Sequence, residues 1–341
     1  MCSVCHQKAA STLHITMIQL PIYISGVLVH LYILTKLCLH AATYLFPSSI
    51  HEYLSTTEDH ESWALITGST AGIGFGFAQE LCAHGFNVII HGKDDQELQD
   101  AAAQLRSAFP LRSIRTFLFD ASTPTASLAT SLTPVLQDIS LRVLVNNVGG
   151  QGGQTRSTYQ RLRDFSSEEV TRVMNVNAHF TTQLTRILLP VLSRAPSLVL
   201  NISSLSATGL PYLSVYAASK AYIDSFTRAL HAEMRAENMP VSVQGIICGN
   251  VQSDGHPLAE GWFVPTSRGM ARAALQRLGP GSRHSPGFRL GYRPVLVAAY
   301  WPHVLQAWGY DILPEAAREW ISIRVLRGLK DEWESVDRRV R

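Results

Sequence analysis

Short apolar runs alternate with longer segments of helical periodicity through the middle of the chain. In the first longer segment Ile73, Phe77 and Leu81 recur every four residues, which places them on one face of a helix. Ser166 and Glu169 have the spacing of a capping box, which predicts another helix start. Because continuous apolar runs are typical of parallel strands buried on both faces, the pattern predicts an α/β fold with a parallel sheet between helices. The apolar runs occupy residues 63–67, 87–90, 114–119, 141–145, 197–202 and 241–247.

The pattern changes beyond residue 253. Residues 254–312 are rich in glycine, proline and aromatic residues around one helical stretch, from about 267 to 278. The remaining residues, 313–341, have the pattern of an amphipathic helix that ends in a charged segment. No linker separates a second domain. We therefore expect one catalytic domain over 62–312, in which 254–312 form a substrate lid, followed by a C-terminal helical tail.

The N-terminal part contains a long apolar segment. Residues 15–46 include no acid and one base, Lys36, and residues 18–35 are 18 uncharged residues in a row. That length is close to the shortest helix that spans a bilayer. A cleaved signal peptide fits less well, because the preceding segment is long and no small-residue cleavage site follows. We therefore interpret residues 1–50 as a single membrane anchor or interfacial helix, with a buried core helix as the alternative.

The composition indicates extensive burial, membrane contact, or both. Apolar residues make up 46% and charged residues 16% of the chain, whereas roughly 25% charged residues are usual in soluble domains. The net charge of +3 is small and dispersed, which argues against nucleic acid as a partner. The five cysteines form no paired framework, so a reducing compartment is the simpler assumption. No metal site is predicted.

The segment "TGSTAGIG", Thr67–Gly74, follows the first apolar run and opens the first helix. Glycines in such a loop allow a tight turn, a close approach of backbone to ligand, and close packing of helix on strand. The free N–H groups at the helix start then favour a pyrophosphate. The order of strand, glycine loop and helix thus predicts a Rossmann-type, doubly wound fold with a dinucleotide site. The residues expected to contact the nucleotide are Thr67, Gly68, Ser69, Gly72, Ile73 and Gly74.

The end of the second apolar run indicates the choice of nucleotide. The sequence there is "HGKDD", residues 91–95, and Lys93 is the charge nearest to the expected place of the adenosine ribose. A cation suits the 2′-phosphate of NADP, whereas an acid suits the 2′-hydroxyl of NAD. We therefore favour NADPH. The alternative is that Lys93 is a solvated side chain and Asp94 caps the next helix.

Tyr216 and Lys220 in "YAASK" are four residues apart and share a helix face, a spacing that also occurs by chance. The motifs that precede the pair are "TGSTAGIG", "NNVG" (146–149), "MNVN" (174–177) and "NISS" (201–204). In this order the motifs resemble the short-chain dehydrogenase/reductase family from about residue 62 to residue 253. With its apolar N-terminal segment and Val148, the chain is most similar to the membrane-anchored 17β-hydroxysteroid dehydrogenase and very-long-chain 3-oxoacyl-CoA reductase branch.

The resemblance implies a proton-transfer mechanism. Tyrosine has an unperturbed pKa of about 10, and Lys220 with a positively charged nicotinamide ring is expected to lower the pKa of Tyr216. Tyr216 would then protonate the carbonyl oxygen as hydride arrives from the nicotinamide, or take part in the reverse reaction. The resemblance also implies that Lys220 holds the nicotinamide ribose hydroxyls and that Asn177 supports a water relay to the lysine.

Further family positions match this chain residue by residue. Asn147 and Gly149 match positions that steady the sheet and line the cofactor pocket, and Asp120 matches an acid that contacts the adenine. The serine that orients the substrate carbonyl has two candidates. The family spacing of thirteen residues before the tyrosine selects Ser203, whereas the usual second serine of "SS" is Ser204. Both are kept, and the spacing favours Ser203.

The loop after the sixth apolar run departs from the family. The family commonly has Pro-Gly and then a threonine for the nicotinamide amide, whereas this chain has "CGNVQS", residues 248–253. Cys248 replaces the proline, Gly249 keeps the turn, and Ser253 would stand in for the threonine. The change loosens the turn, but it removes no acid, base or hydride path.

We therefore expect an NADPH-dependent ketoreductase that acts on a lipophilic substrate such as an acyl-CoA, a steroid or a secondary metabolite. The apolar residues of 254–312 fit such a substrate, although they could equally pack against a membrane or a partner subunit. An oxidative alcohol dehydrogenase is the alternative within enzymes, and a catalytically inactive membrane scaffold is the alternative outside them. The resemblance further implies a location in the endoplasmic reticulum membrane and is compatible with a homodimer.

Overall fold

The computed structural model describes residues 3–54, 61–151, 153–253, 258–279 and 293–340. The chain divides into two compact units. One unit comprises Met1–Pro47 with Phe288–Tyr292, and the other comprises Ser48–Gly287 with Arg293–Arg341. The first unit contains the apolar N-terminal segment and the second contains the sheet, so each unit is considered by itself.

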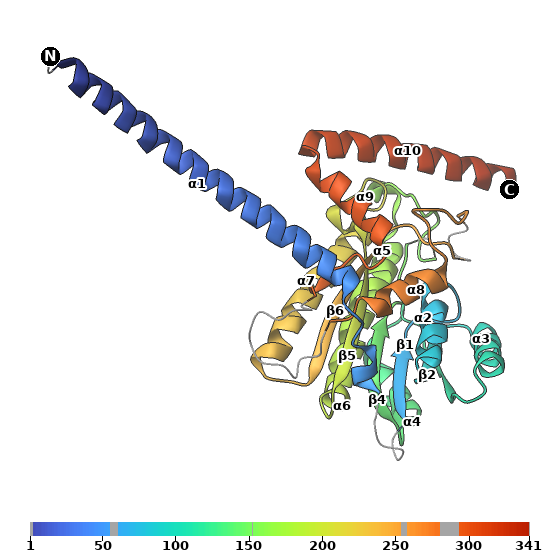
Figure 1. Cartoon of the computed structure of the whole chain (residues 1–341). Coiled ribbons are helices and arrows are strands. Elements are labelled where there is room, and N and C mark those ends of the chain that lie inside the picture. Colours follow the sequence, from blue (N-terminus) through green and yellow to red (C-terminus); the bar gives the residue numbers. More distant parts are fainter. Residues whose placement is uncertain (1–2, 55–60, 152, 254–257, 280–292, 341) are drawn as a thin grey trace. The chain divides into compact units, whose positions relative to one another are not determined.

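The described part of the first unit consists mainly of one long helix, α1 (Ser3–Leu45), drawn in blue in Figure 1. Within α1, the segment Ile22–Leu45 is 24 residues long and has a mean hydropathy of 1.8, and its most apolar stretch is not buried at all. A helix of this length and composition is sufficient to cross a bilayer. The apolar helix predicted for the N-terminal segment is therefore present.

Seven parallel strands form the sheet of the second unit. The strands are β1 (Ser62–Ile66), β2 (Asn87–Gly92), β3 (Ile114–Leu118), β4 (Ser140–Asn146), β5 (Ser197–Ser204), β6 (Val241–Cys248) and β7 (Leu296–Val297). Their order in the sheet is β3-β2-β1-β4-β5-β6-β7 (Figure 1). The order reverses direction between β1 and β4, and open parallel sheets bind ligands at the carboxyl ends of the strands beside such a reversal. The predicted Rossmann-type sheet is confirmed.

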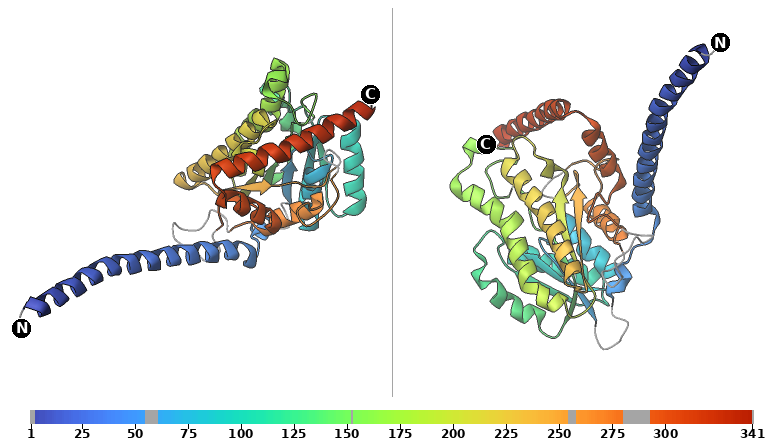
Figure 2. Two further views of the ribbon diagram at one scale, coloured as in Figure 1. Left: turned by 90° about the horizontal axis from the view of Figure 1, so that it is seen from above. Right: turned by 90° about the vertical axis from the view of Figure 1, so that its left-hand side faces the viewer.

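Helices cover both faces of this sheet (Figure 2). The helices of the second unit are α2 (Gly72–Ala83), α3 (Asp95–Ala108), α4 (Leu128–Leu136), α5 (Ser167–Met174), α6 (Phe180–Leu192), α7 (Ser214–Ala236), α8 (Ser267–Gln276), α9 (Trp301–Ile312) and α10 (Glu315–Val340). One apolar core joins α2, α3 and α8 to the sheet, and a second core joins α4, α6 and α7 to it. Ala64 and Ile66 of β1 face the first core, whereas Leu65 faces the second. Because both faces are covered, the strands are apolar at consecutive positions.

The expected lid, 254–312, contains more regular structure than its sequence pattern predicts. Helix α8 begins at Ser267 as expected, but the pattern predicts neither β7 nor α9. Strand β7 has only two residues, which pair with Gly245 and Ile246 of β6, and so short a strand has no periodic pattern to detect. Part of the expected lid lies outside the described residues, namely 254–257 and 280–292.

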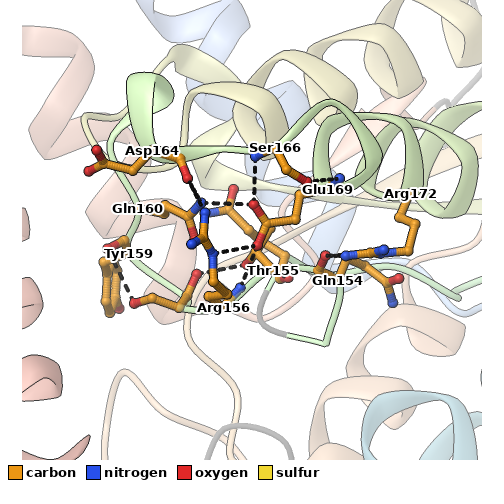
Figure 3. Close-up of polar contacts among 11 residues, drawn as sticks. Gln154, Thr155, Arg156, Tyr159, Gln160, Asp164, Ser166, Glu169 and Arg172 are labelled. Carbon is orange, nitrogen blue, oxygen red and sulfur yellow. Dashed lines mark hydrogen bonds and ion pairs between the residues drawn. The ribbon is translucent and has the colours of Figure 1, made fainter. Parts of the chain in front are cut away.

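A polar network holds the segment that leads from β4 to α5 (Figure 3). The buried Glu169 carboxylate accepts hydrogen bonds from the backbone N–H groups of Ser166 (2.8 Å) and Arg156 (2.9 Å) and from the Gln160 amide (3.2 Å). The Ser166 hydroxyl accepts from the Glu169 N–H, so the predicted capping box is confirmed. Burial by itself raises the pKa of Glu169, but these hydrogen bonds outweigh it and lower the pKa to about 2.

Candidate active site

The loop between β1 and α2 has a backbone that requires glycine. Gly68 and Gly72 have φ angles of +60° and +58°, a region that is costly for other residues. Gly74 is restricted by space, because an added Cβ atom would lie 2.1 Å from the Gly68 carbonyl oxygen and 2.6 Å from the Asn147 amide. The three glycines singled out in the sequence therefore have distinct structural reasons, two for backbone conformation and one for close packing.

Side chains at the ends of β1 and β4 hold this loop in place. The Thr67 hydroxyl accepts hydrogen bonds from the backbone N–H groups of Asn147 (2.9 Å) and Val148 (3.0 Å). In return, the Asn147 side-chain amide donates to the carbonyl oxygens of Thr67 and Gly68, both at 3.0 Å. These bonds join the two strands on either side of the reversal in strand order, so Asn147 steadies the sheet as expected.

A buried histidine at the end of β2 adds a contact that the sequence interpretation missed. The Gly68 N–H donates to His91 Nδ1 at 3.0 Å, and the His91 N–H donates to the Ser69 hydroxyl at 2.9 Å. Burial lowers the pKa of His91 to about 4, which keeps the ring neutral and Nδ1 free to accept. His91 is the first residue of the quoted "HGKDD" motif. A histidine at the end of an otherwise apolar strand was the sequence signal that could have indicated this contact.

The residues expected near the adenosine lie at the ends of β2 and β3. Lys93 is exposed, and Asp94 caps α3 by accepting the Glu97 N–H at 3.0 Å, as the alternative interpretation of Asp94 supposed. Asp120 is half-buried after β3 and accepts the Ser122 N–H at 2.9 Å. Because the ends of neighbouring parallel strands lie at one edge of the sheet, Lys93 and Asp120 belong to the same side of the site.

Asn177, Gly149 and Lys220 come together beside β4 and β5. Asn177 lies in a π-helical turn, Asn175–His179, where its side chain bonds both the N–H and the C=O of Gly150, each at 2.9 Å. A Cβ atom on Gly149 would lie 2.6 Å from Asn177 Oδ1 and 3.1 Å from Lys220 Nζ. The structure therefore places the predicted asparagine and lysine against the same glycine, and a larger residue at position 149 would collide with both.

Tyr216 and Lys220 share one face of α7, with the ammonium 5.7 Å from the centre of the phenol ring. Lys220 is buried, donates to the Ile202 carbonyl oxygen at 2.8 Å, and has its pKa lowered to about 8 by burial. The expected lowering of the Tyr216 pKa is not found in this state of the chain. Burial raises the pKa of Tyr216 to about 12, and the neighbouring hydroxyls of Ser204 and Ser206 offset only part of that rise.

Ser203 and Ser204 lie on opposite sides of β5, because successive strand residues alternate. The Ser204 hydroxyl lies beside the Tyr216 hydroxyl and also accepts the Ser206 hydroxyl at 2.8 Å. The Ser203 hydroxyl is buried beside the carboxylate of Asp224 instead. Of the two serines kept by the sequence interpretation, the structure thus brings Ser204, and not Ser203, to the tyrosine.

The loop after β6 runs from the Tyr–Lys pair to the glycine loop. Cys248 is buried near Tyr216 and Lys220, and burial raises the pKa of its thiol to about 12. At the other end of the loop, a Cβ atom on Gly72 would lie 3.2 Å from the Ser253 Cβ atom. The loop 248–253 therefore borders both parts of the site.

A glycine loop and a Tyr–Lys pair on two sides of the reversal in strand order are typical of oxidoreductases that use a dinucleotide. The comparison with known families agrees with this class. The short chain dehydrogenase family matches residues 62–259, and the chain therefore belongs to that family of oxidoreductases.

The most similar relatives include both an enzyme-like protein and an inactive one. A very-long-chain 3-oxoacyl-CoA reductase-like protein of Arabidopsis thaliana is 31% identical over 264 residues, covering 74% of this chain and 78% of the relative. An inactive hydroxysteroid dehydrogenase-like protein of Mus musculus is 30% identical, covering 75% of this chain and 77% of the relative. Among solved structures, a short chain dehydrogenase of Burkholderia cenocepacia in complex with NADP covers 67% of this chain and 94% of its own, with a TM-score of 0.57 and 21% identity.

Proposed function

We propose that this protein is an NADPH-dependent reductase that converts a carbonyl group of a lipophilic substrate, such as an acyl-CoA or a steroid, into an alcohol. The observation that supports this function most directly is the meeting of Tyr216, Lys220 and Ser204 at the carboxyl end of β5. The substrate class follows from the relatives, whose names are very-long-chain 3-oxoacyl-CoA reductase-like protein and inactive hydroxysteroid dehydrogenase-like protein.

The glycine loop and its surroundings fit a dinucleotide. Gly68 and Gly72 expose backbone at the start of α2, where a pyrophosphate is favoured. Lys93 is an exposed cation suited to the 2′-phosphate, with Asp120 on the adenine side and Ser253 on the nicotinamide side. Bound NADPH supplies the hydride. NADP in the solved relative is consistent with this choice of nucleotide.

The side chains at the end of β5 have separate roles in this proposal. Ser204 donates a hydrogen bond to the substrate carbonyl oxygen, and Tyr216 transfers its phenolic proton to that oxygen. Lys220 holds the ribose hydroxyls and favours the phenolate that remains. Asn177 orders the route by which a proton returns to the site. Burial raises the pKa of Tyr216, so the tyrosine carries its proton at neutral pH, the form that the reductive direction requires. The oxidative alcohol dehydrogenase is the alternative direction at the same site.

The proposal is tested with the full chain in detergent, NADPH, and a panel that includes a 3-oxoacyl-CoA and a ketosteroid. We expect NADPH oxidation that depends on one of these ketones. Ser204→Ala should lower kcat by roughly 10²-fold through loss of one donor to the developing oxyanion, whereas the matched Ser203→Ala should keep wild-type kcat. Equal effects of the two variants would remove Ser204 from its role. A wild-type chain that binds no NADP(H) would instead favour the inactive scaffold alternative, and the mouse relative is likewise named as inactive.

We further propose that Ile22–Leu45 anchors the protein in a membrane, with the endoplasmic reticulum as the expected location. The support is the length of this helix, its hydropathy and its lack of burial. The full chain should then resist extraction by carbonate or high salt and dissolve only in detergent. Full-length protein recovered in the soluble fraction without detergent would defeat the anchor. The size of the detergent-solubilised protein then tests the expected homodimer.

A further inference from the structure

His303 of α9 is completely buried, and both nitrogens of its ring have backbone partners. Nδ1 lies 3.0 Å from the Gly249 nitrogen, and Nε2 lies 3.2 Å from the carbonyl oxygens of both Asn250 and Phe263. The Gly249 N–H can only donate and the two carbonyl oxygens can only accept. These partners therefore require a neutral ring whose single proton is on Nε2.

The ring also occupies the space beside Gly249. A Cβ atom on Gly249 would lie 2.8 Å from His303 Cδ2, 2.9 Å from Nε2 and 3.0 Å from the side-chain oxygen of Gln306. Gly249 needs to be glycine for this contact and not for its backbone conformation, since its φ angle is not positive. Hydrogen bonding and packing thus point independently to one fitted contact between α9 and the start of the loop after β6.

This contact joins segments with different tasks. Gly249 and Asn250 belong to the loop 248–253, which runs from Tyr216 and Lys220 to the glycine loop. Phe263 belongs to a small turn of the lid in which Gly261 and Val264 bond each other's backbone in both directions at 3.0 Å. His303 itself is 54 residues from Gly249 in sequence. One imidazole therefore bonds the loop 248–253 through both nitrogens, at Gly249 and Asn250, and the lid turn through Nε2 alone.

We propose that His303 is a positioning residue that sets the loop 248–253 and the lid turn 261–264 in one arrangement. Both nitrogens hold the loop where the nicotinamide end of the nucleotide is expected, and Nε2 also holds the lid turn. The inference rests on the proposed function for the identity of the nucleotide. It goes beyond that function, because none of the hydride and proton steps uses His303.

Three variants separate the two nitrogens. In His303→Asn the side-chain oxygen can replace Nδ1 as the acceptor for Gly249, while the donor to the lid turn is lost. In His303→Gln the amide nitrogen can replace Nε2 as the donor, while the acceptor for Gly249 is lost. His303→Leu removes both. His231→Leu is the matched control, because His231 is a half-buried histidine of α7 that bonds the Val243 carbonyl oxygen at 3.0 Å.

The first measurement is amide hydrogen exchange of the full chain in detergent without nucleotide. His303→Leu should speed exchange in both 249–253 and 261–264. His303→Asn keeps the bond to Gly249 and should act mainly on 261–264, whereas His303→Gln loses that bond and should act mainly on 249–253. The second measurement is the Kd for NADPH and the KM for the ketone substrate. His303→Leu and His303→Gln should weaken NADPH binding by roughly five- to tenfold, the value of about one hydrogen bond. His303→Asn should keep NADPH affinity and raise the KM for the ketone.

The outcomes distinguish this role from a merely structural one. If all three variants lower the thermal midpoint as His231→Leu does, with wild-type exchange in both segments, the positioning role is overturned. It is also overturned if His303→Asn and His303→Gln show the same pattern in exchange and in binding. A wild-type chain that binds no NADPH overturns the proposed function. Even then, the exchange pattern decides whether His303 positions the loop 248–253 and the lid turn 261–264.

Discussion

The carboxyl ends of β1, β2 and β4 are held by the sheet itself, whereas the loop after β6 is held by a helix from the C-terminal part of the chain. On the first side, His91 and Asn147 come from strand ends and bond Gly68 of the glycine loop, and Thr67 of that loop bonds the N–H of Asn147. On the second side, His303 of α9 bonds Gly249. We call the first group the nucleotide side and the second, with Ser204 and Tyr216, the substrate side.

This difference has a physical consequence. The bonds of the nucleotide side are part of the packed sheet, so a substitution there should change nucleotide binding and the stability of the fold together. On the substrate side, the loop after β6 is held by α9, which only borders the sheet. A substitution there should change turnover or the affinity for substrate or nucleotide while the fold keeps its stability, which is typical of segments drawn from the less stable part of a protein.

Tyr216→Phe should give the largest effect, and it tests the substrate side without changing the nucleotide side. The change removes the transferable proton and leaves the ring, so kcat should fall by roughly 10²–10⁴-fold, the usual contribution of a general acid. The thermal midpoint and the Kd for NADPH should stay near wild type. Steady-state kinetics, nucleotide titration and thermal unfolding of the detergent-solubilised chain check these three expectations. Unimpaired turnover in this variant would remove Tyr216 from the mechanism.

Gly74→Ala should have the opposite signature on the nucleotide side. The added methyl group would lie 2.1 Å from the Gly68 carbonyl oxygen, so the backbone must shift, and overpacking of this kind costs about 1–3 kcal/mol. We expect a lower thermal midpoint together with at least roughly tenfold weaker NADPH binding. The matched control is Gly309→Ala, since Gly309 is a helical glycine with nothing within 4 Å of the added atom. A Gly74→Ala variant that binds NADPH normally would break the comparison.

The two sides also differ in how far the sequence predicts them. Strand, glycine loop and helix follow one another in the chain, so the site between Thr67 and Gly74 is visible as a local pattern. Tyr216 and Lys220 are likewise local, because one helix carries both. These parts of the fold and of the candidate site follow from spacing, periodicity and the family resemblance.

The substrate side depends on contacts that no local pattern contains. Counting thirteen residues back from Tyr216 favours Ser203, but Ser203 faces Asp224 of α7, and Ser204 at the end of β5 lies beside the phenol instead. The two-residue strand β7 exists only because β6 offers it a partner. His303 has no motif around it, and its contact with Gly249 arises only when α9 packs. Burial of Tyr216, which raises its pKa, is equally invisible in the sequence.

Lys93→Asp tests the edge of the nucleotide side with a smaller effect. The side chain is exposed and lies outside the packed strand ends, so stability should not change. Loss of a charge-assisted bond to the 2′-phosphate should shift the ratio of kcat/KM for NADPH over NADH by roughly tenfold or more toward NADH. General damage to the enzyme lowers kcat/KM for both nucleotides alike, so the ratio of the two values is an internal control. An unchanged ratio would show that Lys93 is a solvated surface residue.

Glu169→Gln should have the smallest effect, and the effect should be on stability. This variant sharpens the comparison of the two sides because Glu169 lies near the substrate side. Its network holds the segment before α5, in which the Gln160 N–H donates to the Tyr212 carbonyl oxygen just ahead of α7. The pKa of Glu169 is lowered from 4.5 to about 2 in the fold. A carboxylate with a lowered pKa adds stability that is fully present above its unfolded pKa and is lost as pH falls toward the folded value.

The thermal midpoint of Glu169→Gln should therefore lie below that of wild type at pH 7, and the difference should shrink as pH falls from about 4.5 toward about 2. Glu233→Gln, which changes an exposed carboxylate on α7, should match wild type throughout this range. Thermal unfolding of the full chain at several pH values measures both variants. If the Glu169→Gln difference is absent at pH 7, or is as large at pH 3 as at pH 7, the carboxylate does not stabilise this segment. If kcat of Glu169→Gln falls together with its thermal midpoint, activity and stability are coupled in this segment as they are on the nucleotide side. The segment before α5 then belongs with the nucleotide side.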